Sequence, residues 1–174
     1  MDIHSAAGTE RFDHAILAVH SDQALAMLTD ATPAERDILS AMPYQPNEAI
    51  LHTDESVLPR RRRAWAGWNY RITNNDRAPV AVTYNMSILQ SLETRTPLCV
   101  TLNDSSSIDP AKVLARFTYH HPLYTVPGEV ARARWAEISG INNTHFCGAY
   151  WGNGFHEDGV NSALAVGRQF GATP

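Results

Sequence analysis

The sequence predicts an α+β fold in which a strand-rich middle lies between two helix-bearing ends. Residues 47–122 carry short β-branched and aromatic runs separated by Pro, Asn and Asp, a pattern typical of strands. Residues 1–46 and 123–174 each contain an apolar strand-like run that is followed by a helical pattern. Buried strands that lead into helices favour parallel neighbours, so we expect the first and last strands to share a layer and the middle to be an inserted sheet.

The first region, 1–46, contains one predicted strand and two predicted helices. FDHAILAVH (12–20) is a short apolar run that we expect to form a strand buried on at least one side. The apolar spacing of SDQALAML (21–28) predicts a short helix. Thr32 can cap a second helix, and Glu35 completes a capping box after the proline at the first helical position, so this helix should run to about residue 41.

The middle region, 47–122, is expected to form the sheet. Its predicted strands are EAILHT, AWAGWNYRI, PVAVTY, PLCVTL and LARFTYHH, the last of which ends before Pro122. NMSILQSL (85–92) predicts a helical turn between two of these strands. The mixed spacing of Trp65, Trp68 and Tyr70 places these aromatic side chains in the expected core of the sheet.

The last region, 123–174, is predicted to run helix, strand, loop and helix. PGEVARARWAEI (127–138) has a helical pattern with a proline near its start. THFCGAY (144–150) is an apolar strand, and the glycine-bearing loop WGNGFHEDG (151–159) follows it. VNSALAVGRQF (160–170) predicts the final helix, with its start between Glu157 and Val160.

Length, composition and charge indicate an ordinary globular protein. The chain has 174 residues, 44% hydrophobic and 18% charged, which predicts one domain or one and a fraction. The net charge of −4 provides no global basic field for nucleic acid or an anionic membrane. The first residues resemble no signal peptide, and no apolar run approaches the roughly 20 residues that span a bilayer. We therefore expect a soluble, cytoplasmic protein without a transmembrane segment.

The cysteine and histidine patterns argue against a metal site. Cys99 and Cys147 lie in apolar runs and form no CxxC pair, so reduced core thiols are favoured, although the pattern leaves a disulfide open. His120 and His121 are adjacent on a predicted strand and would point to opposite faces, which prevents them from sharing one ion. No Gly-x-Ser-x-Gly elbow of a hydrolase occurs in the sequence.

Four consecutive arginines, Arg60 to Arg63, could indicate recognition of an anion. On a strand, two of them would lie on each face, and this alternation would dilute any positive patch. The acidic total also argues against non-specific nucleic-acid binding. A carboxylate or a phospholipid headgroup remains the better target if these arginines bind an anion.

The segment 144–170 carries the strongest functional signal. A predicted strand ends at Gly148, a loop with Gly152 and Gly154 follows, and a helix begins near Gly159. A helix N-terminus offers unpaired N–H groups and partial positive charge to an anionic ligand. Glycines in such a loop allow the backbone to approach a ligand closely. A purely structural turn explains the same pattern equally well.

The order and spacing of residues in this segment resemble the C-terminal signature of flavin-containing amine oxidases. Cys147-Gly148-Ala149 stands at the strand end, and Gly154 to Val160 stands at the loop that opens the last helix. Two departures are Ala149-Tyr150 in place of the usual glutamate region and Asp158 at a position that is often glycine. More closely, the chain resembles a bacterial group of predicted NAD/FAD-binding proteins related to amine oxidases and to a domain fused to plant cyclopropane fatty-acid synthases. The resembling runs are FDHAILAVHSDQAL, ILHTD, LPRRRRAWAGWNY, VTYNMSILQSL, VTLN, YHHPLY and FCGAYWGNGFHEDGVNSAL.

The resemblance implies an FAD-dependent oxidoreductase and a set of site residues. It implies cofactor contacts at Ala18, Gly148, Gly152, Gly154, Phe155, His156, Gly159 and Val160, and substrate contacts at Tyr150, Trp151 and Phe155. The backbone N–H groups around Gly159 and Val160 are the best candidates for the pyrimidine edge of the flavin. The resemblance assigns no catalytic residue. Core packing is the competing interpretation for Phe155, Tyr150 and Trp151.

The resemblance covers only the second half of such a flavoprotein. The GxGxxG turn that binds the FAD pyrophosphate does not occur, and the only Gly-x-Gly is Gly152-Asn153-Gly154. Residues 1–46 would be the returning strand and helices of the FAD-binding domain, 47–122 the substrate-side sheet, and 123–174 the segment that returns to the flavin. We therefore expect this chain alone to retain no FAD and to be inactive. Exposed strand edges would then favour a homodimer.

Two questions of function stay open in the sequence. Lys112, the sole lysine, lies outside the segment in which amine oxidases often carry a lysine near the flavin, so amine oxidation is not favoured. A hydride-transferring reaction on another small or lipid-like substrate fits the resemblance better. The alternative is a cofactor-free binding or interaction module in which the glycine loop is purely structural.

Overall fold

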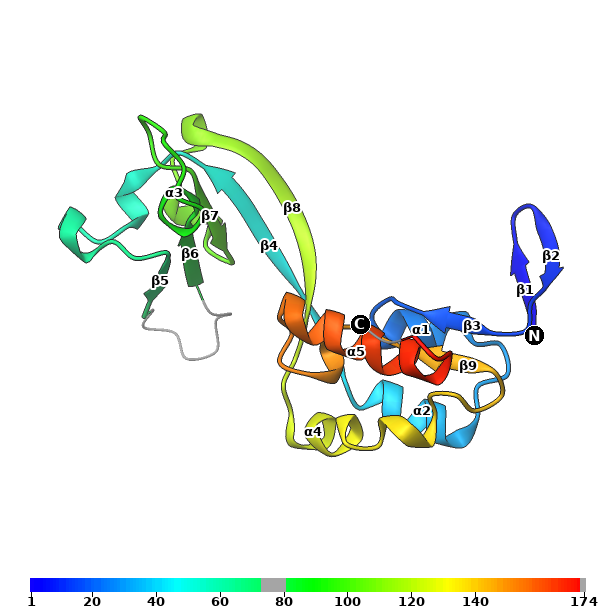
Figure 1. The fold of residues 1–174 in the computed structure, drawn as a ribbon. Helices are drawn as coiled ribbons and strands as arrows, with labels where there is room; N and C mark the ends of the chain where they lie inside the picture. Colours follow the sequence, from blue (N-terminus) through cyan, green and yellow to red (C-terminus); the bar gives the residue numbers. More distant parts are fainter. Residues whose placement is uncertain (73–80, 173–174) are drawn as a thin grey trace. The chain divides into compact units, whose positions relative to one another are not determined.

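The computed structural model describes residues 1–72 and 81–172, and it divides the chain into two compact units. Unit 1 comprises Met1–Gln45 and Pro122–Pro174, and unit 2 is the continuous segment Pro46–His121. Figure 1 shows the mixed α/β content of the chain, with most of the helices in unit 1 and the larger sheet in unit 2.

In its described residues, unit 1 contains two small sheets and four α-helices. The hairpin β1 (Asp2–Ser5) and β2 (Gly8–Arg11) is antiparallel, whereas β3 (Ala15–Leu17) and β9 (Thr144–Phe146) pair in parallel. The parallel pair confirms that the first and last predicted strands share a layer. The helices are α1 (Ser21–Met27), α2 (Pro33–Ser40), α4 (Val126–Arg132) and α5 (His156–Gln169), with 3-10 turns at Trp135–Glu137 and Ala149–Trp151.

The predicted start of α2 is confirmed at the level of individual hydrogen bonds. The Glu35 backbone N–H donates to Thr32 Oγ1 at 3.2 Å, and the Thr32 backbone N–H donates to the Glu35 carboxylate at 2.6 Å. This reciprocal capping box satisfies two backbone donors that the helix leaves unpaired. The helix then ends at Ser40, close to the expected residue 41.

The core of unit 1 is an apolar cluster between its helices and β9. α1 and α2 pack on each other, and α2 also packs on α4. Phe146 of β9 is fully buried at the centre of this cluster. The cluster residues are Ala24, Ile38, Leu39, Met42, Ala131, Ile138, Phe146 and Tyr150.

Unit 2 is built on a five-stranded sheet in the order β5-β6-β7-β4-β8. The strands are β4 (Tyr44–His52), β5 (Trp68–Arg71), β6 (Ala81–Asn85), β7 (Cys99–Leu102) and β8 (Val113–Pro122). The expected helical turn is confirmed as α3 (Met86–Leu89), which Asn85 caps by accepting from the Ile88 N–H. Short 3-10 turns occur at Glu55–Val57, Arg62–Ala64, Ser105–Ser107 and Pro110–Lys112.

Several sequence-based expectations about unit 1 are corrected. The strand expected over 12–20 is only three residues long, and Ile16 at its centre is 52% exposed. The helix expected over 127–138 ends at Arg132 and continues only as a 3-10 turn. The strand expected over 144–150 ends at Phe146 because residues 149–151 turn toward α5. The hairpin of residues 2–11 had no counterpart among the predictions, and the Asp2–Arg11 ion pair holds its open end.

The corrections in unit 2 concern the segment before β6. Arg60 to Arg63 do not lie on a strand, because this segment turns and forms a 3-10 helix at Arg62–Ala64. Trp68 and Tyr70 are not in the core of the sheet and are 57% and 63% exposed. β5 is an edge strand of the sheet, which explains this exposure. Residues 79 and 80 of the predicted strand PVAVTY lie outside the described residues.

Across residues 1–72 and 81–172, no helix is both long enough and apolar enough to cross a bilayer.

Candidate functional site

The candidate site in unit 1 begins where β3 and β9 end side by side. The parallel register aligns Leu17 with Phe146, and the Cys147 N–H extends the pairing by donating to Leu17 O at 3.1 Å. Ala18 is exposed directly after β3. A Cβ atom at Gly148 would lie 3.4 Å from Val19 O, so the two chain segments stay close beyond the strands.

Gly148 is required by its contact with an aromatic ring. A Cβ atom at this position would collide with the Tyr150 ring, and the backbone φ of +157° is one that side-chain-bearing residues rarely adopt. Tyr150 itself is 3% exposed and belongs to the apolar core of unit 1. Burial raises the pKa of the Tyr150 hydroxyl well above its usual range. The Gly148 N–H donates to Ser162 Oγ at 2.8 Å, which ties the strand end to α5.

The loop between Gly148 and α5 is a compact, hydrogen-bonded turn. Gly152 N and Gly154 N both donate to Ala149 O at 3.1 Å. A Cβ atom at Gly152 would collide with the Asp158 carboxylate, and one at Gly154 would collide with the Tyr124 hydroxyl. Gly154 also has a φ of +85°, in the left-handed region that favours glycine. Both glycines are therefore explained by contacts inside unit 1.

Asp158 fixes the entry into α5. Its Oδ2 accepts from Asn153 N at 3.1 Å and from Phe155 N at 2.9 Å. This side chain therefore organises the loop at the position where the resembling family often has glycine. Because these bonds begin the helix at His156, α5 starts earlier than the expected Glu157 to Val160.

The helix start decides which backbone donors remain for a ligand. Asp158 N and Gly159 N both donate to Phe155 O, at 3.1 and 3.2 Å. The N–H groups of His156 and Glu157 therefore precede the first intrahelical bonds, and they are the donors that a helix leaves unpaired. A Cβ atom at Gly159 would have its nearest neighbour at 3.9 Å, so the structure leaves room there. Gly159 contributes open space beside the helix start and not a free N–H group.

The side chains at this helix start are exposed. Phe155 is 59% exposed, and His156 and Val160 are also exposed. Trp151 lies half-buried with its ring centroid 5.0 Å from that of Tyr150. The Tyr150 hydroxyl and the Trp151 indole N–H are buried, and neither has a hydrogen-bond partner within the described part of the chain. The structure therefore gathers the cofactor candidates around the turn, while Tyr150 lies beneath it in the core.

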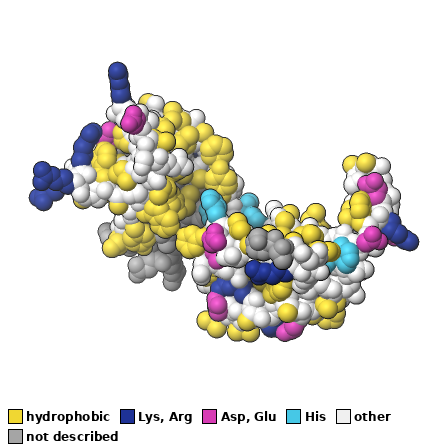
Figure 2. Space-filling view, viewed as in Figure 1, with side chains coloured by type: hydrophobic (Ala, Val, Ile, Leu, Met, Phe, Trp, Pro, Cys, Tyr) yellow, Lys and Arg dark blue, Asp and Glu magenta, His cyan; other side chains and the backbone are white. Residues whose placement is uncertain are grey.

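A second candidate surface is one face of the unit 2 sheet. Directly paired residues in neighbouring strands share a face, and the pairings form two rows of apolar side chains. These side chains are only partly buried apart from Ala49, and hydrophobic side chains are widespread on the surface of unit 2 in Figure 2. The first row is Trp68, Tyr84, Val100 and Leu51, and the second is Tyr70, Val82, Leu102 and Ala49.

The opposite face of this sheet buries a polar chain of hydrogen bonds. Asp54 N donates to His52 Nδ1 at 3.0 Å, so His52 Nε2 carries the hydrogen that faces Thr101 Oγ1 at 2.8 Å. Thr101 Oγ1 lies 2.8 Å from Thr83 Oγ1. Burial lowers the pKa of His52 and favours this neutral form. The sheet therefore has a buried face on which this polar chain lies beside apolar Ile50 and Cys99, and an apolar, partly exposed face.

Lys112 and Asp54 have structural contacts in unit 2. Lys112 Nζ lies 3.0 Å from Asp54 Oδ1, and the N–H groups of Ser56 and Asp109 donate to the same carboxylate at 3.0 and 2.9 Å. Burial alone would raise the pKa of Asp54, but these hydrogen bonds and the Lys112 ammonium hold it well below its usual range. The sole lysine of the chain is thus paired with a buried carboxylate.

Within the described ranges, no group of three His, Cys, Asp or Glu side chains could hold a metal ion. Cys99 and Cys147 are both free and buried. Burial raises the pKa of the Cys99 thiol to about 11, which keeps it protonated at neutral pH.

Sequence reasoning missed the polar contacts that shape both surfaces. Tyr124 and Asp158 account for the two loop glycines, but neither stood out in the sequence as a partner of the loop. The His52–Thr101 contact joins residues 49 positions apart, so no local pattern could predict it. An acidic residue at the third helical position of α5 was the one local signal for the role of Asp158.

Comparison with known proteins identifies the fold. No protein-family model and no curated protein matches the sequence. The chain is similar to the crystal structure of a CLA-producing fatty acid isomerase from P. acnes, with a TM-score of 0.64, 16% identity, and coverage of 97% of this chain and 44% of that one. It is also similar to a candidate protoporphyrinogen oxidase from Exiguobacterium sp. 255-15, with a TM-score of 0.58, 14% identity, and coverage of 95% and 42%. The chain spans less than half the length of either structure, and at these identities the likeness shows a shared fold alone.

Proposed function

We propose that this chain is the C-terminal portion of an FAD-dependent oxidoreductase of the amine-oxidase type. It would supply contacts to the flavin ring and to the substrate, and it would be inactive without a nucleotide-binding portion. The observation that carries the proposal is the β9–turn–α5 unit: the strand end at Gly148 is hydrogen-bonded to Ser162 of α5, and this helix begins at His156 after an exposed Phe155. The fold likeness to parts of two larger enzymes supports it.

The residues present fit one part of FAD. The helix start at His156 offers donors and a partial positive charge, and Gly159 leaves space for a flat ring to approach. They do not fit the pyrophosphate, because the chain has no GxGxxG turn. Bound FAD would supply acceptance of a hydride, while this chain would orient the ring and stabilise negative charge on it.

The substrate portion of the proposal rests on the apolar face of the unit 2 sheet. Val100, Leu102 and Leu51 lie on this face and are only partly buried within unit 2. Such a face suits a lipid-like chain better than a small polar amine. The fatty acid isomerase among the similar structures acts on a molecule of that class, which supports the same choice. We propose the cytoplasm as the site of action.

The outer edges of β3 and β9, unpaired in the part of the chain that the structure describes, are places where another strand or a second copy of the chain could pair. Within the described residues this sheet has only two strands, so each strand has one edge without a partner. We propose that strands of the nucleotide-binding portion pair there and that two copies of the chain associate through these edges in its absence. Light scattering of the purified chain tests this: a monomer at high concentration would contradict the dimer.

The sharpest test of the flavin contact is a graded substitution at Gly159. In the protein that carries the nucleotide-binding portion, Gly159→Ala should weaken flavin binding and Gly159→Val should weaken it further, with folding retained. Gly167→Ala is a matched control, because this glycine lies in the same helix and its Cβ would make an ordinary 3.4 Å contact with Ala172. Flavin titration and thermal unfolding are measured on the same samples.

The outcomes separate the parts of the proposal. Unchanged flavin affinity in folded Gly159→Val would mean that the helix start does not contact the ring. A purified 174-residue chain with a near-stoichiometric flavin absorbance band would refute the need for a second portion.

A cofactor-free binding module is the second candidate, and one observation favours it. Gly148, Gly152 and Gly154 are each explained by side chains within unit 1, without any ligand. In that case the Gly159 substitutions would change stability alone, and no flavin would bind in any context.

A further inference from the structure

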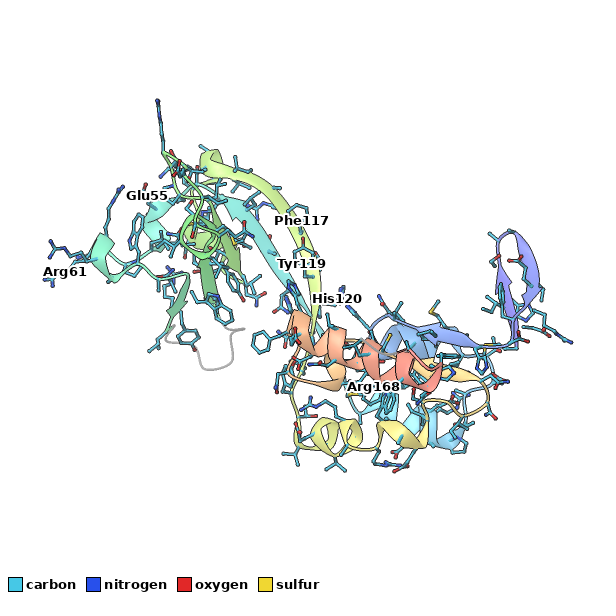
Figure 3. All side chains as sticks on the ribbon, viewed as in Figure 1. Glu55, Arg61, Phe117, Tyr119, His120 and Arg168 are labelled. Atoms are coloured by element: carbon cyan, nitrogen blue, oxygen red, sulfur yellow. The ribbon has the colours of Figure 1, made fainter. Side chains whose placement is uncertain are left out.

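The four consecutive arginines form an exposed turn at one end of unit 2, which we call the arginine turn (Arg60 to Arg63). All four residues are exposed. The segment turns through a 3-10 helix, so the arginines are not divided between the two faces of a strand. Figure 3 shows Arg61 projecting from the tip of this turn, away from the sheet.

Hydrogen bonds hold the arginine turn in a defined conformation. Trp65 Nε1 donates to Pro59 O at 2.8 Å and closes the segment across its base. Ala64 N donates to Arg61 O at 2.8 Å within the turn. Arg62 pairs with Glu55 at 2.9 Å, and its guanidinium lies 5.0 Å from the centre of the Trp65 ring. The folded scaffold therefore presents the cationic side chains together.

The positive charge of this turn is largely uncompensated. Within residues 1–72 and 81–172, Arg60, Arg61 and Arg63 form no ion pair. The one acidic residue in this range that bonds to the turn is Glu55, and it pairs with Arg62. The net charge of −4 belongs to the whole chain. Exposed charges farther away than about 8–10 Å are screened at physiological salt, so the local cluster determines what this surface attracts.

Exposed aromatic side chains follow the turn. Trp68 and Tyr70 lie on β5 and are 57% and 63% exposed, and strand alternation places them on the same face. Figure 1 shows the turn and β5 at the same edge of unit 2. Tryptophan and tyrosine are the side chains that favour the boundary between lipid headgroups and hydrocarbon.

We propose that unit 2 docks on an anionic lipid surface through the arginine turn, with Trp68 and Tyr70 entering the headgroup layer. The guanidinium groups of Arg60, Arg61 and Arg63, which form no ion pair with any described residue, match the negative phosphates of such a surface, and their fork of N–H donors suits phosphate oxygens. The flanking aromatics add the apolar component that a purely electrostatic contact lacks. This docking is independent of flavin binding.

The test measures partition of the full chain onto vesicles. Phosphatidylcholine vesicles containing phosphatidylglycerol should bind the chain, and vesicles of phosphatidylcholine alone should bind it far more weakly. Each arginine near an anionic surface contributes about fivefold, so R60Q/R61Q/R63Q should reduce the partition coefficient by roughly 100-fold. R36Q/R95Q/R168Q is the matched control: it removes the same charge from exposed positions outside the turn that form no ion pair within the described residues, and it should change partition by less than about threefold.

A second variant separates the apolar component from charge. W68S/Y70S should reduce partition by about tenfold and leave the dependence on salt unchanged. Circular dichroism confirms the fold of every variant.

Three outcomes would overturn the proposal. The first is no binding of the wild-type chain to the anionic vesicles. The second is an equal loss in the two arginine triples, which would indicate net charge alone. The third is an oligonucleotide that binds the turn while the vesicles do not, which would identify the ligand as nucleic acid.

Discussion

The two units of this protein differ in composition at their buried positions, because polar side chains make up a larger share of the buried residues in unit 2 than in unit 1. Unit 1 closes its core with apolar side chains such as Ile38, Leu39 and Phe146, packed between helices and β9. Unit 2 buries the polar side chains of His52, Thr83 and Thr101 on one face of its sheet. The other face of that sheet carries partly exposed Val, Leu, Tyr and Trp side chains.

This difference shows where each unit can offer a binding surface. Apolar side chains that fill a core are unavailable to a ligand, so at the turn before α5 unit 1 offers backbone donors and glycines. In unit 2 the polar chain holds the sheet together, and the apolar face remains accessible. A buried polar network is compatible with folding only when its members are hydrogen-bonded, and the His52 chain meets this condition.

The largest expected effect is on the apolar core of unit 1. Phe146→Ala should lower the free energy of unfolding of unit 1 by about 3–5 kcal/mol, because Phe146 is fully buried and its loss leaves a cavity. Urea unfolding followed by hydrogen exchange reports the two units separately. Phe155→Ala, an exposed phenylalanine in the same unit, should cost no more than about 0.5 kcal/mol. An equal loss of free energy of unfolding in the two variants would show that burial of Phe146 does not stabilise the core of unit 1.

The next effect concerns the polar interior of unit 2. Asp54→Asn replaces a carboxylate that accepts from Ser56 N, Asp109 N and Lys112 Nζ, and it should cost about 2 kcal/mol. The control is Glu48→Gln, which breaks an exposed ion pair with Arg116 and should cost less than about 1 kcal/mol. If both variants lose the same stability, the buried Asp54 carboxylate contributes no more to the free energy of unfolding of unit 2 than an exposed ion pair does.

Acid should weaken unit 2 through the same polar interior. The pKa of His52 is lowered in the folded state, so its contribution to stability is present above about pH 6.5 and declines as the pH falls toward the folded pKa. The pKa of Asp54 is also lowered, so its contribution is lost below about pH 4. Each group changes stability by at most about 1.4 kcal/mol per pH unit.

A single substitution checks the histidine part of this pH dependence. His52→Gln should remove the loss of unit 2 stability that begins below about pH 6.5, measured by hydrogen exchange after correction for the intrinsic pH dependence of exchange. If the stability of unit 2 still falls with pH at the same slope in His52→Gln, another titrating group causes the decline.

The smallest expected effect is at the capping box of α2 in unit 1. Thr32→Ala should cost about 1 kcal/mol, because the Glu35 N–H loses its acceptor. Thr32→Ser keeps the hydroxyl oxygen and should restore most of this stability. Thermal unfolding measures both variants, and a Thr32→Ser variant as unstable as Thr32→Ala would show that the hydroxyl is not the stabilising group.

Features set by neighbouring residues were predicted well from the sequence. The start of α2 depends on Thr32 and Glu35, three positions apart, and α3 depends on Asn85 in the same local way. Features set by distant partners were not predicted. The exposure of Trp68 follows from the position of β5 at the sheet edge, and the conformation at Gly154 is coupled to Tyr124.

The candidate site shows the same division. The glycines and the helix that follow β9 were identified in the sequence, because their spacing is local. Which N–H groups remain unpaired depends on the Asp158 carboxylate, which moves the helix start to His156. No periodic pattern in the sequence predicted the buried hydrogen bonds of unit 2, because strand pairing is what brings His52 and Thr101 together.

The way unit 2 begins and ends has a consequence for protein engineering. Asn47 Nδ2 lies 2.9 Å from His121 Nδ1, so the two ends of this unit are joined by their own side chains. In unit 1, Leu123 N donates to Pro43 O at 2.8 Å, so the two points from which the chain leaves are also adjacent. One uninterrupted stretch of coding DNA thus specifies unit 2, and a short linker between Gln45 and Pro122 would close the gap left by its removal. The sheet can therefore be exchanged as a cassette, whereas unit 1 has to be reassembled from two separated stretches of the gene.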